Sequence, residues 1–322
     1  MPPKPAALSD STPGLGEIEA RKFMNSTSVS TLSFAYPLRL IPLPSRPPVH
    51  AALIFTHTYG EGLVAGDEID LHVKVRQDAR LILLTQGNTK VYKSPSKDIR
   101  TTQGLTAKIE PGAALVLLQD PIQPFKGSTY EQLQVFYIDP MYSNLLLLDW
   151  VCEGRTAMGE AWDFWEWKSR NEVWSGTGQT DEEDSHQKPK LLIRDNIRLG
   201  STVILGEDTR EEMYNLGVFG TLFIRGPMFR TIGKAFLDEF SHLPRIGTNT
   251  QIVAQSQSPR PTQLPKGKPQ VTWTAASTRG FVVVKFGARQ VAEVKMWLNG
   301  ILSKDGTIPR EFGEHAMMCL RI

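Results

Sequence analysis

Short apolar segments of two kinds recur along the chain, and they restrict its fold more than any other feature. The stretch Ile69–Arg76 alternates apolar and polar side chains without a break, as in a strand with one buried face. Leu133, Val135 and Tyr137 alternate in the same way. Continuous apolar runs such as Ala114–Leu118 are typical of strands that are buried on both faces. We therefore predict a mostly β fold, a layered β-sheet scaffold that is either β-helix-like or a sandwich.

Two segments in the C-terminal part have helical periodicity instead. Apolar side chains recur at helical spacing near Phe229–His242 and again near Ala288–Leu302. We predict an α-helix in each segment, with one buried face. The proline-dense stretch Leu38–Pro48 is incompatible with a helix, and it is predicted to be an edge strand or an extended arm.

The predicted domain organisation follows from length and local composition. The 322 residues suffice for one large domain or two ordinary ones, and we predict a single β domain over residues 31–322. Residues 1–30 are rich in Pro, Ser and Thr and are predicted to form a flexible tail. Insertions near 175–190, with an acidic run at 181–184, and near 254–270, rich in Ser, Gln and Pro, are predicted to be disordered.

Charge and cysteine content exclude several classes of protein. The chain has 36 basic and 34 acidic side chains, and this near balance argues against a nucleic-acid binder. Cys152 and Cys319 are too few for a disulfide framework, which indicates a reducing compartment. No apolar stretch is long enough to span a bilayer, and the N-terminus lacks the apolar core of a secretory signal. We expect a soluble, cytoplasmic protein that binds neither nucleic acid nor membranes.

One cluster of soft ligands stands near the C-terminus, at His315–Cys319. Imidazole, thioether and thiolate together suit late transition metals, so His315 and Cys319 are candidate metal ligands. The alternative is an apolar C-terminal strand. No complete metal-binding motif occurs, and we expect no tightly bound cofactor.

The stretch Glu160–Trp167 combines carboxylates with three tryptophans. Glycoside hydrolysis uses paired carboxylates beside aromatic platforms, so a carbohydrate-active β-fold enzyme using Glu160, Asp163 or Glu166 is one alternative. In a strand, however, the three tryptophans would divide between two faces, which favours structural aromatic residues. A non-catalytic β binding module with an exposed aromatic patch is a further alternative.

Six blocks of sequence, taken in order, resemble the urease accessory protein D family (UreD, also called UreH). The strongest match is the segment from Thr85 to Tyr92, which includes Gln86, Thr89 and Lys90. The other blocks are His57–Asp67, Leu117–Ser128, Gly154–Glu160, Gly217–Ile224 and Ala276–Val283. The resemblance runs from about Leu32 to the C-terminus. It departs from the family pattern at Glu61, which separates two glycines, and at Asp120-Pro121.

The resemblance implies a function in metal delivery without catalysis. Members of this family are all-β scaffolds, not enzymes, that are needed to insert nickel into the urease active site. The implied partners are the urease apoenzyme and the accessory proteins F and G, of which G is a GTPase. A transient nickel ion passing through a conduit is also implied, with no tightly held cofactor.

Family motifs also supply the candidate site residues. A conduit requires acidic groups that hold a hydrated cation weakly, and the candidates are Asp67, Asp120 and Glu160. Further motif residues with structural roles are Gly66, Thr85, Gln86, Thr89, Lys90, Arg155, Gly159 and Gly220. The alternative interpretation is that Arg155 and Glu160 form a structural ion pair and that Gly66-Asp67 forms a turn.

Overall fold

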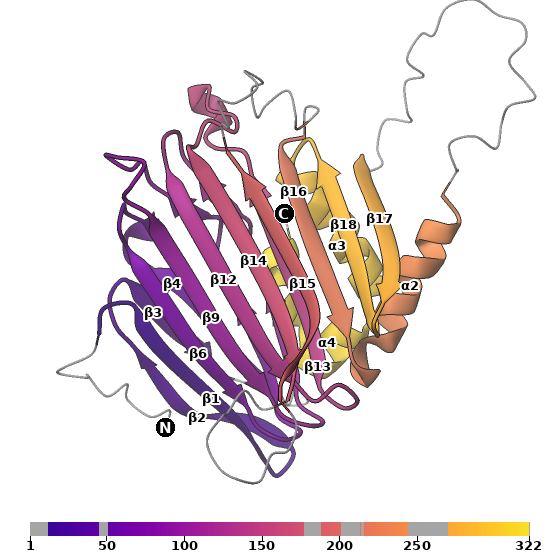
Figure 1. Ribbon diagram of the computed structural model, residues 1–322. Coiled ribbons are helices and arrows are strands. Elements are labelled where there is room, and N and C mark those ends of the chain that lie inside the picture. Colours follow the sequence, from indigo (N-terminus) through magenta and orange to yellow (C-terminus); the bar gives the residue numbers. More distant parts are fainter. Residues whose placement is uncertain are drawn as a thin grey trace, which may run out of the picture.

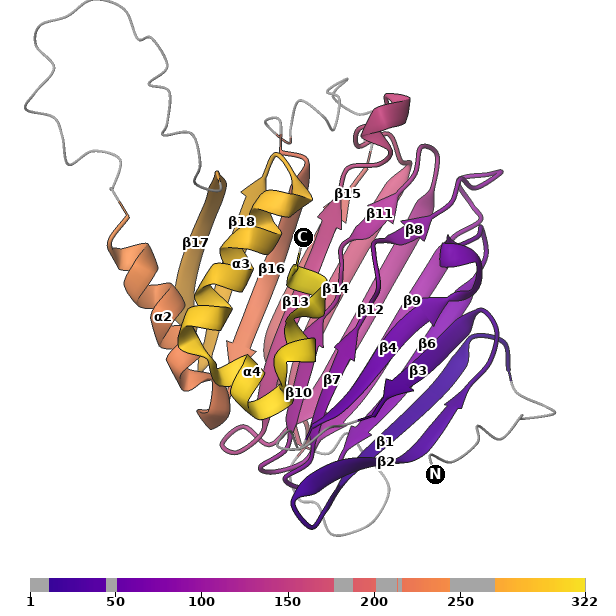
Figure 2. The same ribbon diagram turned by 180° about the vertical axis from the view of Figure 1, so that it is seen from behind.

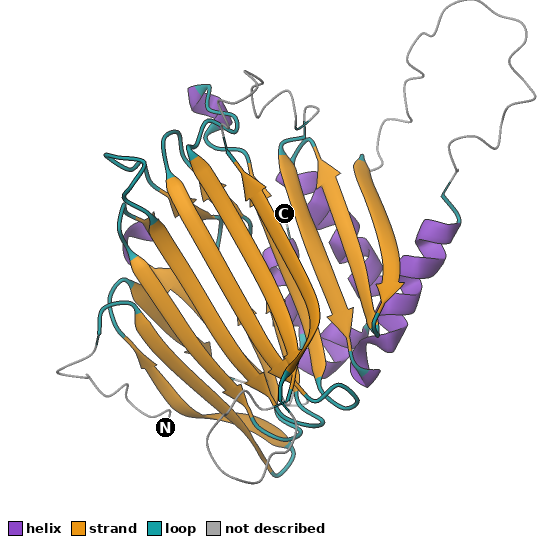
Figure 3. Ribbon diagram, in the orientation of Figure 1, coloured by secondary structure: helices purple, strands orange, loops and turns teal. Residues whose placement is uncertain are grey.

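The computed structural model describes residues 12–44, 51–176, 188–200, 213, 216–243 and 270–321. Within these residues two β-sheets stack face to face, and helices cover the outer face of the larger sheet (Figures 1 and 2). Strands predominate over helices, as Figure 3 shows. The predicted mostly β, layered architecture with C-terminal helices is confirmed.

The smaller sheet has seven strands in the described part of the chain. In spatial order these are β15 (Lys190–Leu199), β14 (Glu166–Ser175), β12 (Thr129–Ile138), β9 (Thr101–Ile109), β6 (Glu68–Val75), β1 (Leu15–Phe23) and β2 (Ser26–Phe34). The strands from β14 to β1 are parallel neighbours, whereas β15 and β2 pair antiparallel at the two edges.

The larger sheet also has a parallel centre. Its spatial order is β17 (Val271–Thr278), β18 (Phe281–Ala288), β16 (Val218–Arg225), β13 (Asn144–Cys152), β10 (Ala114–Leu118), β7 (Arg80–Leu84), β4 (Ala52–Thr58) and β3 (Leu38–Leu43). Three short strands pair beside this path, namely β5 (Gly62–Leu63), β8 (Thr89–Val91) and β11 (Ile122–Pro124). The strands β4, β7, β10 and β13 are parallel neighbours.

Successive coils of the chain build both sheets together. The strands β6, β9 and β12 each lead through a short turn into β7, β10 and β13, and longer connections return to the smaller sheet. Neighbouring parallel strands therefore belong to successive coils, so the fold is the β-helix-like member of the two predicted architectures. Register repeats between coils: Leu84, Leu118 and Leu148 occupy equivalent positions in β7, β10 and β13.

Both faces of the central strands are buried, which explains their continuous apolar runs. On β10, Leu115 and Leu117 pack between the two sheets, whereas Val116 and Leu118 pack against the helices. A strand with a sheet on one side and helices on the other has no solvent-facing positions to fill with polar residues.

The helical layer consists of α2 (Arg230–Ser241), α3 (Val291–Asp305), α4 (Thr307–Phe312) and the 3₁₀ segment η4 (Glu314–Leu320). Shorter 3₁₀ turns are η1 (Tyr59–Glu61), η2 (Thr156–Met158) and η3 (Pro227–Phe229). The helix α3 begins with a capping box of Gln290 and Glu293 and ends at Gly306, which has a left-handed φ of 75°. Both predicted helices are present. Among the described helices, none combines the length and apolar character that crossing a bilayer requires.

The predicted N-terminal tail is wrong from residue 15 onward, because β1 and β2 occupy most of residues 15–34. Ile18 and Ala20 of β1 are fully buried, and β1 adds in parallel to β6. The Ser- and Thr-rich composition belongs to β2, an edge strand whose exposed face needs no apolar residues. Residues 1–11 lie outside the described part of the chain.

The remaining predictions about segments are confirmed in one case, wrong in another, and lie largely outside the described residues in the others. The strand β3 lies at the edge of the larger sheet, as the prolines of Leu38–Pro48 predict. In the two predicted insertions, residues 177–187 and 254–269 lie outside the described residues, and β14 and β15 extend into the first at Ser175 and Lys190. A C-terminal strand at His315–Cys319 is wrong, because this segment is part of η4.

Candidate functional site

Four long connections lie at one end of the parallel stack, opposite the short turns. They comprise residues 59–67, 85–100, 119–128 and 153–165, and each leads from a strand of the larger sheet to one of the smaller sheet. Because parallel strands end on the same side, these connections lie near one another (Figure 1). Four of the six sequence blocks that resemble a known family therefore meet at this end.

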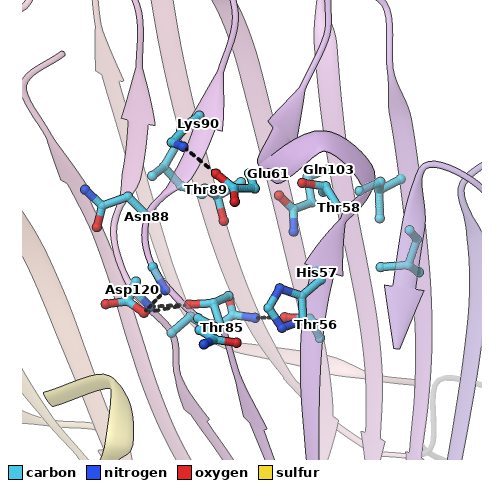
Figure 4. Close-up of a pocket in the computed structure, with 16 residues that line it drawn as sticks. Thr56, His57, Thr58, Glu61, Thr85, Asn88, Thr89, Lys90, Gln103 and Asp120 are labelled. Carbon is cyan, nitrogen blue, oxygen red and sulfur yellow. Dashed lines mark hydrogen bonds and ion pairs between the residues drawn. The ribbon is translucent and has the colours of Figure 1, made fainter. Parts of the chain in front are cut away.

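A polar cavity of about 390 Å³ opens among these connections, and we name it the signature pocket (Figure 4). Its walls come from β3, β4, η1, β6, the segment after β7, β9 and the segment after β10. The lining residues are Leu38, Thr56, His57, Thr58, Glu61, Ile69, Thr85, Gln86, Gly87, Asn88, Thr89, Lys90, Gln103, Gln119, Asp120 and Ile122. The motif residues predicted from the strongest block, from Thr85 to Lys90, all line this cavity.

Asp120 fixes the shape of the pocket wall. Its side chain is buried, and one carboxylate oxygen accepts hydrogen bonds from the Thr85 hydroxyl at 3.2 Å and the Gly87 amide at 2.9 Å. The Asp120 backbone amide donates in return to the Thr85 hydroxyl at 2.7 Å. The other carboxylate oxygen lies 2.5 Å from the ammonium of Lys295, which comes from α3. Two successive coils and the helical layer are thus joined at one carboxylate.

The opposite wall offers neutral polar groups. The amide of Gln119 donates to the Thr56 hydroxyl at 3.0 Å, and this hydroxyl donates to the Leu84 carbonyl at 3.1 Å. Burial and the charge of Arg39 hold the pKa of His57 below its usual value. A lowered pKa keeps this imidazole neutral at physiological pH, the form in which histidine binds metal ions.

A charged pair stands on another side of the cavity. Lys90 donates to the Glu61 carboxylate at 3.0 Å, and this bond is the main reason why the pKa of Glu61 is lowered. Glu61 has 84% of its side chain exposed, so solvent screens the pair. The pair links η1 to β8, and Figure 4 shows it beside Thr58 and Thr89.

Two thiols lie close to the pocket wall but are protonated. Cys319 donates to the Thr85 carbonyl at 2.9 Å, and burial followed by the charge of Asp120 raises its pKa to about 12. Cys152 accepts from the Asn88 amide at 3.6 Å, and burial raises its pKa to about 12 as well. His315 is exposed whereas Cys319 is buried, so the predicted pair of soft ligands is divided between surface and core.

Of the three predicted conduit carboxylates, all within the described residues, Asp120 lines the pocket and the other two do not. Asp67 caps a turn, where it accepts from the Val64 amide at 2.8 Å beside Gly66, which has a φ of 84°. Glu160 accepts from the Arg155 side chain at 3.0 Å and from the Lys126 amide at 3.2 Å. The alternative interpretations of these two motifs, a turn and an ion pair, are therefore the ones that the structure contains.

The remaining motif glycines have local roles. Gly159 ends η2 in the left-handed region with a φ of 75°. At Gly220 a Cβ atom would lie 2.4 Å from the Cβ of Trp150, so only glycine fits between β13 and its neighbours.

The interior between the two sheets contains a chain of polar side chains that begins at the signature pocket with the half-buried Gln103 and continues into buried positions. Gln103 lines the pocket and accepts from the Tyr130 hydroxyl at 2.9 Å, and the same hydroxyl lies 3.2 Å from the Gln132 amide oxygen. Gln132 donates to the Asp149 carboxylate at 3.0 Å. We name the set Gln103, Tyr130, Gln132, Asp149, Ser169 and Asn171 the interior polar chain.

Asp149 is the charged centre of the interior polar chain. It accepts from Ser169 at 2.5 Å and from Asn171 at 2.6 Å, in addition to Gln132. Burial raises the pKa of Asp149 despite these three donors, with a further contribution from the charge of Asp195. Asp195 in turn binds Lys285 at 2.8 Å.

No sequence motif marked the interior polar chain. The only signal is alternation on β12, where Gln132 and Gln134 share the buried face with Tyr130, Phe136 and Ile138. The apolar residues of the alternation point the other way, and Leu133 is exposed. The expectation that Leu133, Val135 and Tyr137 mark the buried face is therefore wrong, because the interior between the sheets is partly polar.

The carboxylates considered for glycoside hydrolysis are each paired with cations. Glu160 pairs with Arg155, Asp163 pairs with Lys126, and Glu166 contacts Arg100, Lys168 and Arg198. Trp162, Phe164 and Trp167 are buried in the core, as predicted for structural aromatics. Only the last of these lies in a strand, since β14 begins at Glu166. Within the described residues, no group of three His, Cys, Asp or Glu side chains is placed to hold a metal ion.

Comparison with known proteins identifies the family of this chain. The model of the family described as UreD urease accessory protein matches residues 14–317. The chain belongs to the UreD family. In this chain, four of the six blocks that resemble the family meet at one end of the β-helix-like stack.

Relatives of the UreD family from fungi and plants match most of the chain. An uncharacterized urease accessory protein ureD-like of Schizosaccharomyces pombe is 29% identical over 89% of this chain and 93% of its own length. Urease accessory protein 4 of Cryptococcus neoformans is 30% identical over 86% of both chains. Urease accessory protein D of Oryza sativa is 35% identical over 73% of this chain and 72% of its own. These names support a function in urease maturation.

Proposed function

We propose that this protein is a non-catalytic scaffold that delivers nickel to the urease active site. In this proposal it bridges the urease apoenzyme and the accessory proteins F and G in the cytoplasm. Nickel is its cargo, passing through the molecule without becoming a resident cofactor. The observation that best supports the proposal is the interior polar chain, which continues from the signature pocket into the space between the sheets.

The polar interior is hard to explain by stability alone. A buried polar group without a partner costs about 1–3 kcal/mol, and an apolar interior would avoid that risk. The amide oxygens of Gln134 and Asn171 are buried and have no hydrogen-bond partner within the described residues. Of these two residues, Asn171 also contacts the carboxylate of Asp149. Such spare oxygen acceptors suit a divalent cation that must exchange its hydration shell gradually.

Weak binding is a requirement of the proposal. A strong metal site converges three or more ligands, whereas Asp149 offers a single carboxylate surrounded by amide and hydroxyl groups. Conduction requires binding that is favourable enough for entry and weak enough for exit. The interior polar chain has the donor types for such transient contacts.

The proposal is tested by two substitutions on opposite faces of β12, one that removes a polar side chain from the interior and one that adds a polar side chain to the exposed face. Gln132→Leu replaces an inward amide of β12 with an apolar side chain of similar size, and Leu133→Gln makes the reverse change on the exposed face of the same strand. Both variants are expressed with apo-urease and the accessory proteins. Nickel bound per urease active site is then measured by atomic absorption, and assembly is measured by co-purification.

We expect Gln132→Leu to assemble normally but to lower the nickel content of urease several-fold, while Leu133→Gln leaves it unchanged. Normal nickel loading by folded Gln132→Leu would contradict passage through the interior. Failure of the parent chain to co-purify with urease or with the F and G proteins would contradict the bridging role itself.

A catalytic function is not supported by the site. Each carboxylate of the Glu160–Trp167 stretch is neutralised by at least one cation, and its buried aromatics are packed in the core. Glycoside hydrolysis instead requires two carboxyl groups facing one substrate cleft.

A further inference from the structure

Asp120 has a neighbour that its role in the pocket wall does not explain. The ammonium of Lys295 lies 2.5 Å from one carboxylate oxygen, and the two side chains are 17% and 3% exposed. Lys295 belongs to α3, far along the chain from Asp120. The other carboxylate oxygen already accepts two hydrogen bonds from the Thr85–Gly87 segment. The two hydrogen bonds to the loop thus do not involve Lys295, whose ammonium lies against the other oxygen of the carboxylate.

A soft ligand lies at the same place. The Cys319 thiol donates to the Thr85 carbonyl at 2.9 Å, and it is close enough to Asp120 and Lys295 for both charges to act on it. The carboxylate of Asp120, the thiol of Cys319 and the hydroxyl of Thr85 therefore surround one small region. Oxygen and sulfur donors of this kind suit a divalent cation such as Ni²⁺. In this protein the position of a cation beside Asp120 is taken by an ammonium group.

We propose that Lys295 is a fixed counter-cation behind the wall of the signature pocket, whose ammonium occupies the position beside Asp120 and Cys319 that a divalent cation would otherwise take. The inference rests on the proposed passage of nickel through this pocket. A carboxylate in the wall of a passage and a thiol directly behind that wall would retain nickel, and retention would stop delivery. With the ammonium in place, both groups stay occupied while nickel passes the neutral side of the pocket.

The test is to remove the positive charge and measure nickel binding by the purified chain. Lys295→Gln removes the charge and keeps a similar length, whereas Lys295→Arg keeps the charge. Lys234→Gln is the matched control, because Lys234 forms an exposed ion pair on α2, away from the pocket lining. Ni²⁺ alone is the probe, measured by equilibrium dialysis with a folded state verified by circular dichroism.

We expect Lys295→Gln to bind one Ni²⁺ per chain with a dissociation constant at least about tenfold below that of the parent chain. The arginine variant and the control should bind like the parent. The double variants Lys295→Gln/Asp120→Asn and Lys295→Gln/Cys319→Ser should lose the gain. The bound ion should show thiolate-to-nickel charge-transfer absorption that the serine variant lacks. In this reaction a Ni–S bond replaces the S–H bond, and the proton goes to the buffer.

Unchanged nickel affinity in folded Lys295→Gln would overturn the inference and leave the proposed passage intact. If Lys295→Gln folds poorly, its melting temperature is measured with and without Ni²⁺. A rise of several degrees that the Asp120→Asn double variant lacks would show that nickel replaces the ammonium. The absence of a rise would again overturn the inference. If Lys295→Gln retains nickel but urease is loaded normally, the result supports Lys295 as a counter-cation and contradicts the passage of nickel through this pocket.

Discussion

The two faces of β13 have opposite surroundings, although every residue of this strand is buried. Leu146, Leu148 and Trp150 face the helical layer, where their neighbours are the aliphatic and aromatic side chains of α2, α3 and β18. Asp149 shares the other face with Leu145, Leu147 and Val151, and it meets the interior polar chain there. One strand thus separates an apolar layer from a layer with a buried charge.

This difference indicates that the two layers contribute differently to the stability of the fold. Apolar burial contributes about 25 cal/mol for each Å² removed from water, so the helical layer stabilises the fold without any requirement for hydrogen-bond geometry. A buried carboxylate with three donors contributes little net stability, because its desolvation offsets its hydrogen bonds. Substitutions on the two sides of β13 should therefore differ in size, in pH dependence and in their effect on function.

The largest loss of stability is expected in the helical layer. Phe236 of α2 is fully buried and contacts the rings of Trp273 and Trp297, at centroid distances of 6.1 Å and 5.7 Å. Phe236→Ala removes these contacts and leaves a cavity, so it should lower the free energy of unfolding by about 3–5 kcal/mol. Denaturant titration followed by circular dichroism measures this change. The neighbouring half-buried Leu237 is the control, and a smaller loss for Phe236→Ala than for Leu237→Ala would contradict the assignment.

A smaller loss with a distinct pH dependence is expected between the sheets. Asp149→Asn keeps the shape of the side chain but turns an amide donor toward existing donors, which should lower the free energy of unfolding by about 1–3 kcal/mol. Burial raises the pKa of Asp149 above its unfolded value of 3.8, so the folded state binds the proton more strongly. The associated stability is present below pH 3.8 and is lost as pH rises through the folded pKa.

The measurement for Asp149 is the difference in unfolding free energy between the parent and Asp149→Asn across that pH window. Other groups titrate equally in both proteins and cancel. The parent should lose stability relative to the variant as pH rises, with a slope of at most about 1.4 kcal/mol per pH unit. A difference that does not change with pH, or that slopes the other way, would show that burial does not raise the pKa of Asp149 in the folded state.

Sequence patterns predicted the apolar layer better than the polar one. Leu145–Leu148 is a continuous apolar run of the same kind as Ala114–Leu118. This run and the helical spacing near Phe229–His242 both indicate burial, because an apolar environment selects apolar residues at every position. Asp149 follows that run directly, and nothing local distinguishes it from the end of a buried strand. On β12 the alternation even marked the wrong face, since Leu133 is exposed while Gln132 is buried.

The candidate site was predictable only where it is local in sequence. Thr85, Gln86, Thr89 and Lys90 lie in one segment, and the resemblance to a family found them together. The residues that complete the pocket come from other coils, and Lys295 reaches Asp120 from a helix near the C-terminus. Such pairings depend on the register of β7 against β10 and on the docking of α3, which spacing alone does not encode.

The smallest expected effect concerns Glu160, which lies in the long connection 153–165 at the same end of the molecule as the signature pocket. Its pKa shift is opposite in direction to that of Asp149. The hydrogen bond from Arg155 is the main cause that lowers the pKa of Glu160 below its unfolded value of 4.5, against a rise from burial. Stability from this group is therefore present above pH 4.5 and is lost as pH falls through the folded pKa.

Glu160→Gln should destabilise the protein slightly at pH 7, because 44% of the Arg155 side chain is exposed and water solvates its freed charge. The deficit relative to the parent should vanish in acid, the reverse of the trend for Asp149. Thermal unfolding from pH 3 to pH 7 checks this, with the exposed Glu314→Gln as control. A deficit that persists unchanged at low pH would mean that Glu160 acts through packing and not through its charge.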